Sequence, residues 1–216
     1  MYLLKILPEE HIPEIKDFLG KMDGPVKALF FSRRAGCTGC VEAKALLDDL
    51  SFLSDNLVVE KYFHEEHSDV FKLHNVSLLP SIILESEHIK GSVRFLGVPL
   101  GYEFASFLED LIGASKGSFD LPKNLVEDIV KVEKDLHIQV FITLSCPYCP
   151  IAVKVAHSFA MVNPHITADM IDASLFPELS MKYYVSAVPK TIINDAAEIL
   201  GAFPPKVLFE KIRELL

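Results

Sequence analysis

The 216-residue sequence lacks the features that mark several common classes of protein. No stretch approaches the roughly 20 consecutive apolar residues that a transmembrane helix requires. No block of basic residues is present, and 21 Lys and Arg stand against 30 Asp and Glu, which argues against a nucleic-acid partner. Neither a Gly-x-Gly-x-x-Gly motif nor a P-loop occurs, so a bound nucleotide is not expected. These absences predict a soluble globular protein with no nucleic-acid or membrane partner.

The sequence also lacks tryptophan, has one Gln and five Asn, and shows no export signal. Within the first ten residues, MYLLKILPEE, acids stand where a signal peptide would continue its apolar segment. We therefore expect a cytoplasmic protein. The scarcity of thermolabile amides, together with abundant Lys and Glu, is typical of thermophilic proteins.

Only four cysteines are present, and all four belong to two Cys-x-x-Cys pairs, Cys37–Cys40 and Cys146–Cys149. No cysteine is left over for a structural bridge. In a cytoplasmic protein such pairs are either redox centres or metal ligands. Each pair directly follows its own predicted strand, and a shared zinc site would not require this. The context therefore favours redox chemistry.

The two pairs belong to an internal repeat with an offset of 109 residues. At this offset Val76-Ser77 aligns with Val185-Ser186, and Pro80 aligns with Pro189. In both copies the proline follows the last cysteine by 40 residues. A later anchor, Phe95-Leu-Gly97, aligns with Ile199-Leu-Gly201 at an offset of 104, which a hairpin shorter by five residues would explain. The chain is therefore interpreted as two copies of one fold.

Hydrophobic periodicity and Gly/Pro punctuation give both copies the same order of elements. In the first copy we expect helices at 9–20, 38–53, 66–74 and 101–115, and strands at 26–32, 57–63, 81–85 and 89–96. In the second we expect helices at 121–136, from Pro147, at 177–184 and at the C-terminus, and strands at 139–144, 166–171, 190–193 and 198–202. The predicted fold class is α/β, with two tandem thioredoxin-like domains, residues 1–117 and 118–216, each a mixed central sheet flanked by helices.

Three segments resemble a known family, the two-domain protein disulfide oxidoreductases of thermophilic archaea and bacteria, which are also called glutaredoxin-like proteins. They are Cys146-Pro-Tyr-Cys-Pro-Ile-Ala-Val, Val185-Ser-Ala-Val-Pro-Lys190 and Phe95-Leu-Gly-Val-Pro-Leu-Gly-Tyr-Glu-Phe-Ala-Ser-Phe-Leu-Glu-Asp110. The resemblance extends over essentially the whole chain. It implies an enzyme that reduces, forms or isomerises protein disulfides, with protein dithiols and disulfides as substrates and a thioredoxin reductase-like flavoprotein as electron donor.

The cysteine roles follow from the chemistry of disulfide exchange. The thiolate is the nucleophile, and a cysteine at a helix N-terminus has a lowered pKa because backbone N–H groups and the helix dipole stabilise the anion. Cys146 is therefore the predicted attacking thiol, and Cys149, one turn further on, is the predicted resolving thiol. By the same geometry Cys37 attacks and Cys40 resolves. No cofactor beyond these two redox-active disulfides, and no metal, is expected.

Two prolines are the next candidate site residues. In the resembled fold the proline before the third strand is cis and faces the cysteines, so that the preceding backbone pairs with a substrate strand. This assigns substrate binding to Pro189 with Val188 and to Pro80 with Leu79. Gly201, and more weakly Gly97, would form a third wall of the groove. The alternative is that each proline simply begins a strand.

The two centres are not equivalent in sequence. Pro147 and Tyr148 make the second motif glutaredoxin-like and are candidate substrate-binding residues. Thr38 and Gly39 replace them in the first motif, and Gly39 is expected to weaken the start of its helix. We therefore predict that Cys146–Cys149 is the main catalytic pair. No acid lies in the strand before either motif, so the group that would accept a proton is not identified from the sequence.

Two other functions remain open at the level of sequence. A glutathione-dependent or peroxidase-linked electron carrier would use the same cysteines, and a non-catalytic scaffold could hold zinc between the two pairs. Arg33 and Arg34 are either an electrostatic aid to Cys37 or a solvated loop, which is the more common case. The segment His64-Glu-Glu-His67 is interpreted as a solvated helix start and not as a metal site. His157 is given no role.

Overall fold

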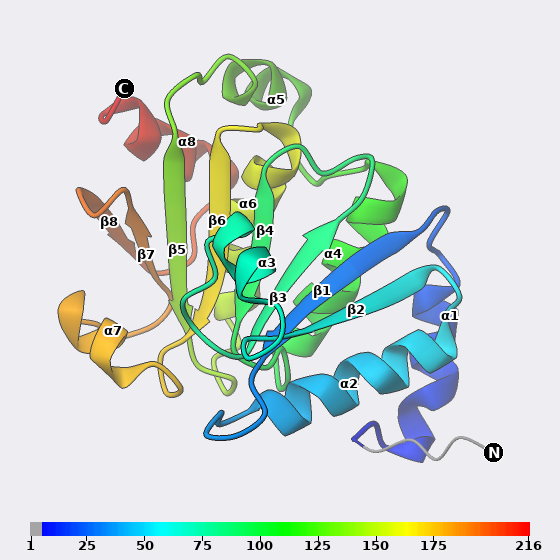
Figure 1. The fold of residues 1–216 in the computed structure, drawn as a ribbon. Coiled ribbons are helices and arrows are strands. Elements are labelled where there is room, and N and C mark those ends of the chain that lie inside the picture. Colours follow the sequence, from blue (N-terminus) through cyan, green and yellow to red (C-terminus); the bar gives the residue numbers. More distant parts are fainter. Residues whose placement is uncertain (1–5) are drawn as a thin grey trace.

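The structure is a computed structural model that describes residues 6–216 and contains one mixed sheet of eight strands with helices on both faces (Figure 1). The first half comprises η1 (Glu9–His11), α1 (Ile12–Leu19), β1 (Val26–Ser32), α2 (Cys40–Leu53), β2 (Leu57–Phe63), α3 (Ser68–Leu73), β3 (Ser81–Glu85), β4 (Ser92–Leu96) and α4 (Glu103–Lys116). The second comprises α5 (Lys123–Ile129), β5 (Leu136–Ile142), α6 (Cys149–Val162), β6 (Ile166–Asp172), α7 (Pro177–Lys182), β7 (Lys190–Ile193), β8 (Ala197–Leu200) and α8 (Pro205–Arg213). Residues 1–5, part of the segment used above to argue against a signal peptide, lie outside this description.

The strand order repeats the internal symmetry of the sequence. It is β2-β1-β3-β4 in the first half and β6-β5-β7-β8 in the second, and the two halves are joined where β4 pairs with β6 in parallel. Strands β3 and β7 run opposite to the other six. The predicted α/β fold with thioredoxin-like mixed sheets flanked by helices is confirmed, and the two sheets form one continuous layer.

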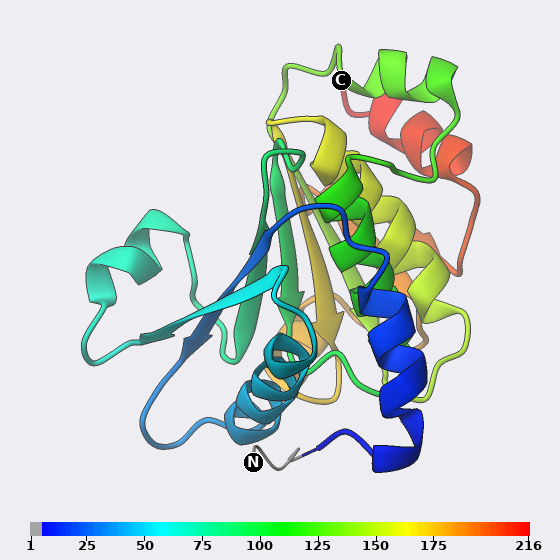
Figure 2. The same ribbon diagram turned by 90° about the vertical axis from the view of Figure 1, so that its right-hand side faces the viewer.

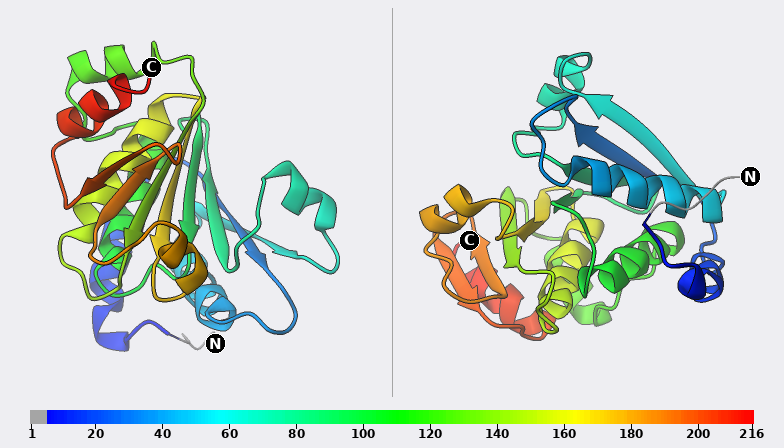
Figure 3. Two further views of the ribbon diagram at one scale, coloured as in Figure 1. Left: turned by 90° about the vertical axis from the view of Figure 1, so that its left-hand side faces the viewer. Right: turned by 90° about the horizontal axis from the view of Figure 1, so that it is seen from below.

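Alternation of side chains along the strands divides the core between the two faces of the sheet. In β1, Phe30 belongs to the large cluster under α2, α4 and α6, whereas Leu29 and Phe31 pack with Phe71 of α3. On the side of α3, the corresponding cluster under α7 includes Phe141 of β5. Figures 2 and 3 show α3 on the opposite side of the sheet from α4 and α6. None of the helices in residues 6–216 has the length and apolar character needed to cross a bilayer.

One predicted helix is much shorter in the structure. The helix expected at 121–136 ends at Ile129, and β5 begins at Leu136. The side-chain amide of Asn163 donates hydrogen bonds to the carbonyl oxygens of Ile129 and Val132, at 2.6 and 2.9 Å. This tertiary contact satisfies carbonyls at the helix end, where no intrahelical partner remains. The expected strand 139–144 is correspondingly displaced to Leu136–Ile142.

The hairpin of the first half also differs from the prediction. The strand expected at 89–96 begins at Ser92, because the backbone N–H groups of Lys90 and Gly91 instead donate to Met161 and Ala160 at the end of α6. The second hairpin is shorter, with only residues 194–196 between β7 and β8. Its turn has three residues instead of six and each of its strands is one residue shorter, and together these differences account for the change of offset from 109 to 104.

Candidate functional site

Both cysteine pairs lie at the same edge of the sheet. Each pair follows the carboxyl end of a first strand, β1 or β5, and these strands point in the same direction. Each pair forms its own disulfide, with Cα atoms 5.5 Å apart in both. Four strand spacings of about 4.8 Å separate β1 from β5, or roughly 19 Å. Four thiolates around one zinc ion at about 2.3 Å are incompatible with this separation.

In each pair the first cysteine is more exposed to solvent than the second. Cys146 is 8% exposed and Cys149 is fully buried, while Cys37 is half-buried and Cys40 is 6% exposed. At the second centre, the backbone N–H of Cys149, the first residue of α6, donates to Cys146 Sγ at 3.1 Å. This hydrogen bond from a helix N-terminus is the kind of contact that stabilises a thiolate.

The two prolines have the backbone conformation that the family resemblance implied. The Leu79–Pro80 and Val188–Pro189 peptide bonds are both cis. The carbonyl oxygen of Val188 lies 3.9 Å from Cys146 Sγ, so this loop faces the predicted nucleophile. Substrate binding by the residues around both prolines is not tested by this geometry and stays a prediction.

In both copies the glycine on the third side of the groove makes the same backbone hydrogen bond to the cis-proline. Gly201 N–H donates to the Pro189 carbonyl at 2.8 Å, and Gly97 N–H donates to the Pro80 carbonyl at 3.0 Å. Both glycines have positive φ, +104° and +121°, which other residues rarely adopt. Each proposed groove thus has a motif turn, a cis-proline and a glycine as its three sides.

Two predictions about the motif turns are wrong in detail. Pro147 does not begin the helix. It lies in the turn before Tyr148, the N-cap residue, and Pro150 is the proline in the first turn of α6. Gly39 does not weaken the helix from within, because α2 begins one residue later, at Cys40. Gly39 is the N-cap and has φ +83°, a left-handed conformation that only glycine adopts readily.

A buried acid that the sequence analysis missed lies on α4, the helix that packs against α6. Glu103 is the first residue of α4 and is fully buried. Helices α4 and α6 run in the same direction, because Tyr102 N–H bonds to Leu144 just before the second motif, while Asp110 meets His157 two turns later. This register places Glu103 at the level of the first turn of α6, where Cys149 lies. Helix α4 of the first half thus brings a carboxyl group to the centre of the second half.

The surroundings of Glu103 shift its titration into the neutral range. Burial raises the pKa of Glu103 to about 7, although the Ser106 hydroxyl and His157 act in the opposite direction. Glu103 Oε2 accepts a hydrogen bond from Ser106 at 2.6 Å. Glu103 Oε1 and His157 Nε2 are both buried and have no hydrogen-bond partner within residues 6–216. A carboxyl group with a pKa near neutrality is suited to proton transfer.

His157 is a member of the same buried cluster. Its Nδ1 lies 2.6 Å from Asp110 Oδ2, and both side chains are almost completely buried. Burial raises the pKa of Asp110, and the neighbouring His157 counteracts this. The sequence did contain a signal for these acids. Glu103 and Asp110 lie on the same face of α4 as the buried Phe107, where apolar side chains are expected. Sequence alone does not show which helix that face meets.

Other candidates have structural partners. Arg34 Nε donates to Glu66 at 3.0 Å and its guanidinium lies over the Phe63 ring, as expected of a solvated loop. His67 Nδ1 accepts from the Phe63 N–H at 3.1 Å. Within the described chain no three His, Cys, Asp or Glu side chains form a group that could hold a metal.

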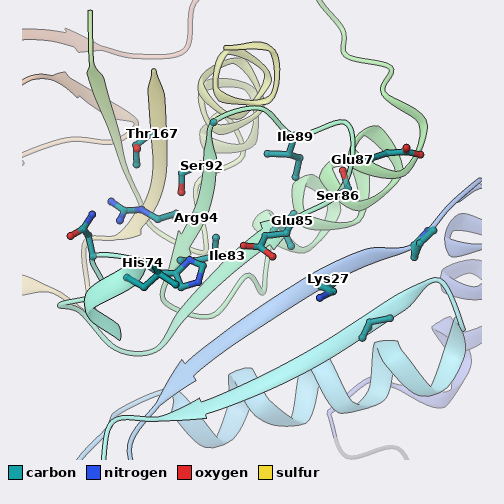
Figure 4. A pocket seen from close by; sticks show the side chains of 16 residues that line it. Lys27, His74, Ile83, Glu85, Ser86, Glu87, Ile89, Ser92, Arg94 and Thr167 are labelled. Atoms are coloured by element: carbon teal, nitrogen blue, oxygen red, sulfur yellow. The ribbon is translucent and has the colours of Figure 1, made fainter. Parts of the chain in front are cut away.

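A hollow of 710 Å³ lies on the side of the sheet that carries α3, away from both disulfides (Figure 4). Its walls include Lys27, His74, Glu85 and Arg94, and it contains no cysteine. It therefore plays no part in the candidate site at the sheet edge.

Comparison with known proteins agrees with the geometry. Residues 136–215 match the family model described as "Thioredoxin domain". The crystal structure of a protein disulfide oxidoreductase from Aeropyrum pernix K1 is 28% identical, covers 97% of this chain and 93% of its own, and superposes with a TM-score of 0.88. The resemblance to the two-domain protein disulfide oxidoreductases is thereby confirmed.

A second group of similar proteins consists of peroxide-related enzymes. The alkyl hydroperoxide reductase component AhpF of Staphylococcus aureus is 27% identical over 181 residues, which is 84% of this chain and 32% of that protein. The AhpF structure from Enterococcus faecalis, at 24% identity, shares the fold with a TM-score of 0.85 over 95% of this chain and 99% of the other. This chain spans only 27% to 32% of the length of the curated relatives that it matches.

Proposed function

We propose that this chain, a thiol–disulfide oxidoreductase of the thioredoxin fold, exchanges disulfides with protein substrates, with Cys146–Cys149 as the principal centre and Cys37–Cys40 as the second. One observation carries this ranking. Cys146 Sγ accepts the Cys149 N–H at 3.1 Å and lies 3.9 Å from the Val188 carbonyl beside the cis-proline. The sulfur of Cys146, the predicted nucleophile, therefore lies next to both the N-terminus of α6 and the Val188 backbone that is proposed to pair with substrate.

Reduction of a substrate proceeds in two balanced steps. The Cys146 thiolate attacks one sulfur of the substrate disulfide, and the other substrate sulfur leaves as a thiolate. The Cys149 thiol then loses its proton, and its thiolate attacks Cys146 Sγ. The second substrate sulfur is released, and the Cys146–Cys149 disulfide remains. Two electrons have passed from the protein to the substrate, and the reverse sequence forms a substrate disulfide.

Glu103 is the proposed acceptor of the Cys149 proton. It is buried at the level of the first turn of α6, and its pKa of about 7 keeps both protonation states accessible at neutral pH. A general base is most effective when its pKa lies near the working pH. The carboxylate takes the proton as Cys149 attacks and returns it when the disulfide is reduced again.

The substrate groove of the second centre has three proposed sides: Pro147 and Tyr148, Val188 and Pro189, and Gly201. The β7 ladder begins at Lys190, so the backbone of Val188 is outside the sheet pairing and is positioned to pair with an extended substrate. The Tyr148 side chain is 66% exposed, an aromatic contact surface next to Cys146. At the first centre Leu79 and Pro80 are the proposed counterparts of Val188 and Pro189.

The two disulfides are the proposed redox groups, and a thioredoxin reductase-like flavoprotein is the proposed electron donor. A cytoplasmic location is supported by the use of every cysteine in a Cys-x-x-Cys pair, since none forms a structural bridge. A second candidate function is electron supply to a peroxide-reducing partner, favoured by the similarity to the alkyl hydroperoxide reductase component AhpF. Faster reduction by glutathione than by the flavoprotein would instead indicate a glutathione-linked carrier.

The test compares single cysteine variants in reduction of insulin by dithiothreitol. We expect Cys146→Ser to lose at least about tenfold in rate and Cys37→Ser to retain most of the activity, because only the former removes the principal nucleophile. Alkylation mass spectrometry across a redox-buffer series, with zinc assayed in the same sample, should show two two-electron steps, one per pair. Full activity in Cys146→Ser with loss in Cys37→Ser would reverse the ranking, and four protected thiols with bound zinc would overturn the function.

A further inference from the structure

The groove of the first centre contains a side chain from the second half of the molecule. Leu175, in the connection between β6 and α7, is close to the sides of that groove. A methyl group placed on Gly39 of the motif turn would lie 3.5 Å from Leu175 Cδ2 and 3.6 Å from the ring of the cis-proline Pro80. A methyl group on Gly97, the glycine side, would lie 3.7 Å from the same leucine atom. Leu175 therefore lies close to the motif-turn side and the glycine side of the groove, and the Pro80 ring borders the same space above Gly39.

The backbone around Leu175 is held in place. Asp172 at the end of β6 accepts hydrogen bonds at its carbonyl from the N–H groups of Leu175 and Phe176, both at 3.1 Å, and at its carboxylate from Ser174 N–H at 2.9 Å. Phe176 is buried in the cluster beneath α7, and Leu175 packs against this cluster. The loop is thus fixed to the sheet, and the leucine is presented to the groove by a tight turn.

At the glycine side of the second centre the nearest side chain comes from the same half of the molecule. A methyl group on Gly201 would come within 4 Å of only the Phe203 ring, at 3.4 Å, among the described residues. The topology explains the difference. The glycine side of the first groove follows β4, which pairs with β6 of the second half, whereas the glycine side of the second groove follows β8, the outer strand of the sheet.

We propose that Leu175 is a specificity-determining residue that fills the peptide groove of the first centre and restricts it to small thiols. This inference rests on the proposed function of Cys37–Cys40 as a redox centre. Cys37 is half-buried and thus within reach of a small dithiol. An extended substrate that pairs with the Leu79 backbone needs the space between Gly39 and Gly97, and the leucine side chain lies in that space.

A small dithiol reacts without using the groove. One thiolate attacks Cys37 Sγ, and Cys40 leaves as a thiolate, giving a mixed disulfide. The second thiol of the reagent loses its proton to solvent. Its thiolate attacks the reagent sulfur that is bonded to Cys37 Sγ, and Cys37 leaves as a thiolate. The reagent ends as a cyclic disulfide, and the centre has gained two electrons. Neither step requires a strand to lie along the cis-proline.

The experiment uses the full chain with the second centre removed by Cys146→Ser and Cys149→Ser. In this background Leu175→Ala is compared with Leu179→Ala, a leucine of the same apolar cluster that comes from α7 and is not among the nearest neighbours of Gly39 or Gly97. Two rates are measured: insulin reduction under dithiothreitol, and reduction of oxidised Cys37–Cys40 by dithiothreitol alone, followed by alkylation mass spectrometry.

We expect Leu175→Ala to raise the insulin rate about tenfold, a typical effect of opening an apolar subsite, and to change the dithiothreitol rate less than about twofold. Leu179→Ala should leave both rates near those of the parent. Equal insulin rates in the two folded variants, with a reactive first centre, would overturn the role of Leu175. A first centre that does not react with dithiothreitol in any variant would overturn the proposed redox function of that pair and this inference with it.

Discussion

At the scale of single residues, the asymmetry between the centres lies less in the motifs than in what surrounds them. The second half has a carboxyl group, Glu103, at the level of the first turn of α6, and it is supplied by α4 of the other half. Its neighbours Ser106, Asp110 and His157 act on the pKa of that group in opposite directions. Burial dominates, and it holds the carboxyl group neutral over much of the acidic range.

Replacement of Glu103 by Gln tests the proposed role of its carboxylate as the proton acceptor. We expect Glu103→Gln to slow insulin reduction about a hundredfold and to abolish the rise of the rate with pH through about 7, because no carboxylate remains to accept the Cys149 proton. The measurement is a pH–rate profile. Glu109→Gln, on the same helix but partly exposed and paired with Lys154, is the control. An unchanged profile in Glu103→Gln would contradict the proton-acceptor role.

The same shift has a consequence for folding. The folded protein binds a proton at Glu103 more tightly than the unfolded chain, so stability falls as pH rises from about 4.5 through about 7. The full effect of such a shift is on the order of 3 kcal/mol. In urea denaturation at a series of pH values, Glu103→Gln should therefore show a weaker decline over this window than the parent protein. A parallel decline in both proteins would show that Glu103 is not the group responsible.

At the scale of elements, the junction between β4 and β6 is the feature on which the joined sheet depends. Arg94 of β4 makes two hydrogen bonds to Asp169 of β6, at 2.6 and 2.8 Å, and His137 Nε2 of β5 lies 2.7 Å from the same carboxylate. Asp169 is almost fully buried. Burial alone would raise its pKa, but the His137 hydrogen bond and the Arg94 charge outweigh it and hold the pKa below its usual value.

Loss of this carboxylate leaves a nearly buried guanidinium without its charge partner. We expect Asp169→Asn to lower the free energy of unfolding by about 3–5 kcal/mol, as is typical when one member of a buried ion pair is removed. Urea denaturation at neutral pH measures this loss. The double replacement Arg94→Met with Asp169→Leu is the control and should recover most of the stability. A double variant as unstable as the single one would show that charge pairing is not the cause.

At the scale of the whole molecule, two sequence repeats behave as one structural unit. The main apolar cluster contains residues of both halves, with Phe107 of α4 and Phe159 of α6 among its fully buried members. Helices α4 and α6 pack side by side, and β4 continues the sheet into β6. The domain boundary proposed between residues 117 and 118 therefore divides the repeats, while packing and hydrogen bonding cross it.

This continuity predicts one cooperative unfolding transition. In scanning calorimetry of the oxidised protein we expect a single peak whose calorimetric and van't Hoff enthalpies agree, because neither half can unfold without exposing the other's core. Fragments 1–117 and 118–216, produced separately, should aggregate, since β4 and β6 become unpaired edges. Two resolved transitions, or two soluble fragments with native circular dichroism, would show independent domains.

The sequence by itself predicted the repeat, the order of strands and helices, and the cysteine pairs, because these depend on local periodicity and on short motifs. It also supplied the positions of Pro80 and Pro189, whose cis peptide bonds followed from the family resemblance. It misplaced the end of the helix at 121–136, because the amide of Asn163, which holds that turn, comes from more than 30 residues further along the chain.

Only the tertiary structure decided how the two copies influence each other. Glu103 and Leu175 are ordinary in sequence, an acid in an amphipathic helix and a leucine in a loop. They become neighbours of the opposite half's centre because β4 pairs with β6 and α4 packs against α6. Local sequence patterns predict which face of a helix or strand is buried. Long-range strand pairing and helix packing decide which element that face contacts. They therefore also decide which side chains come together where the two halves meet.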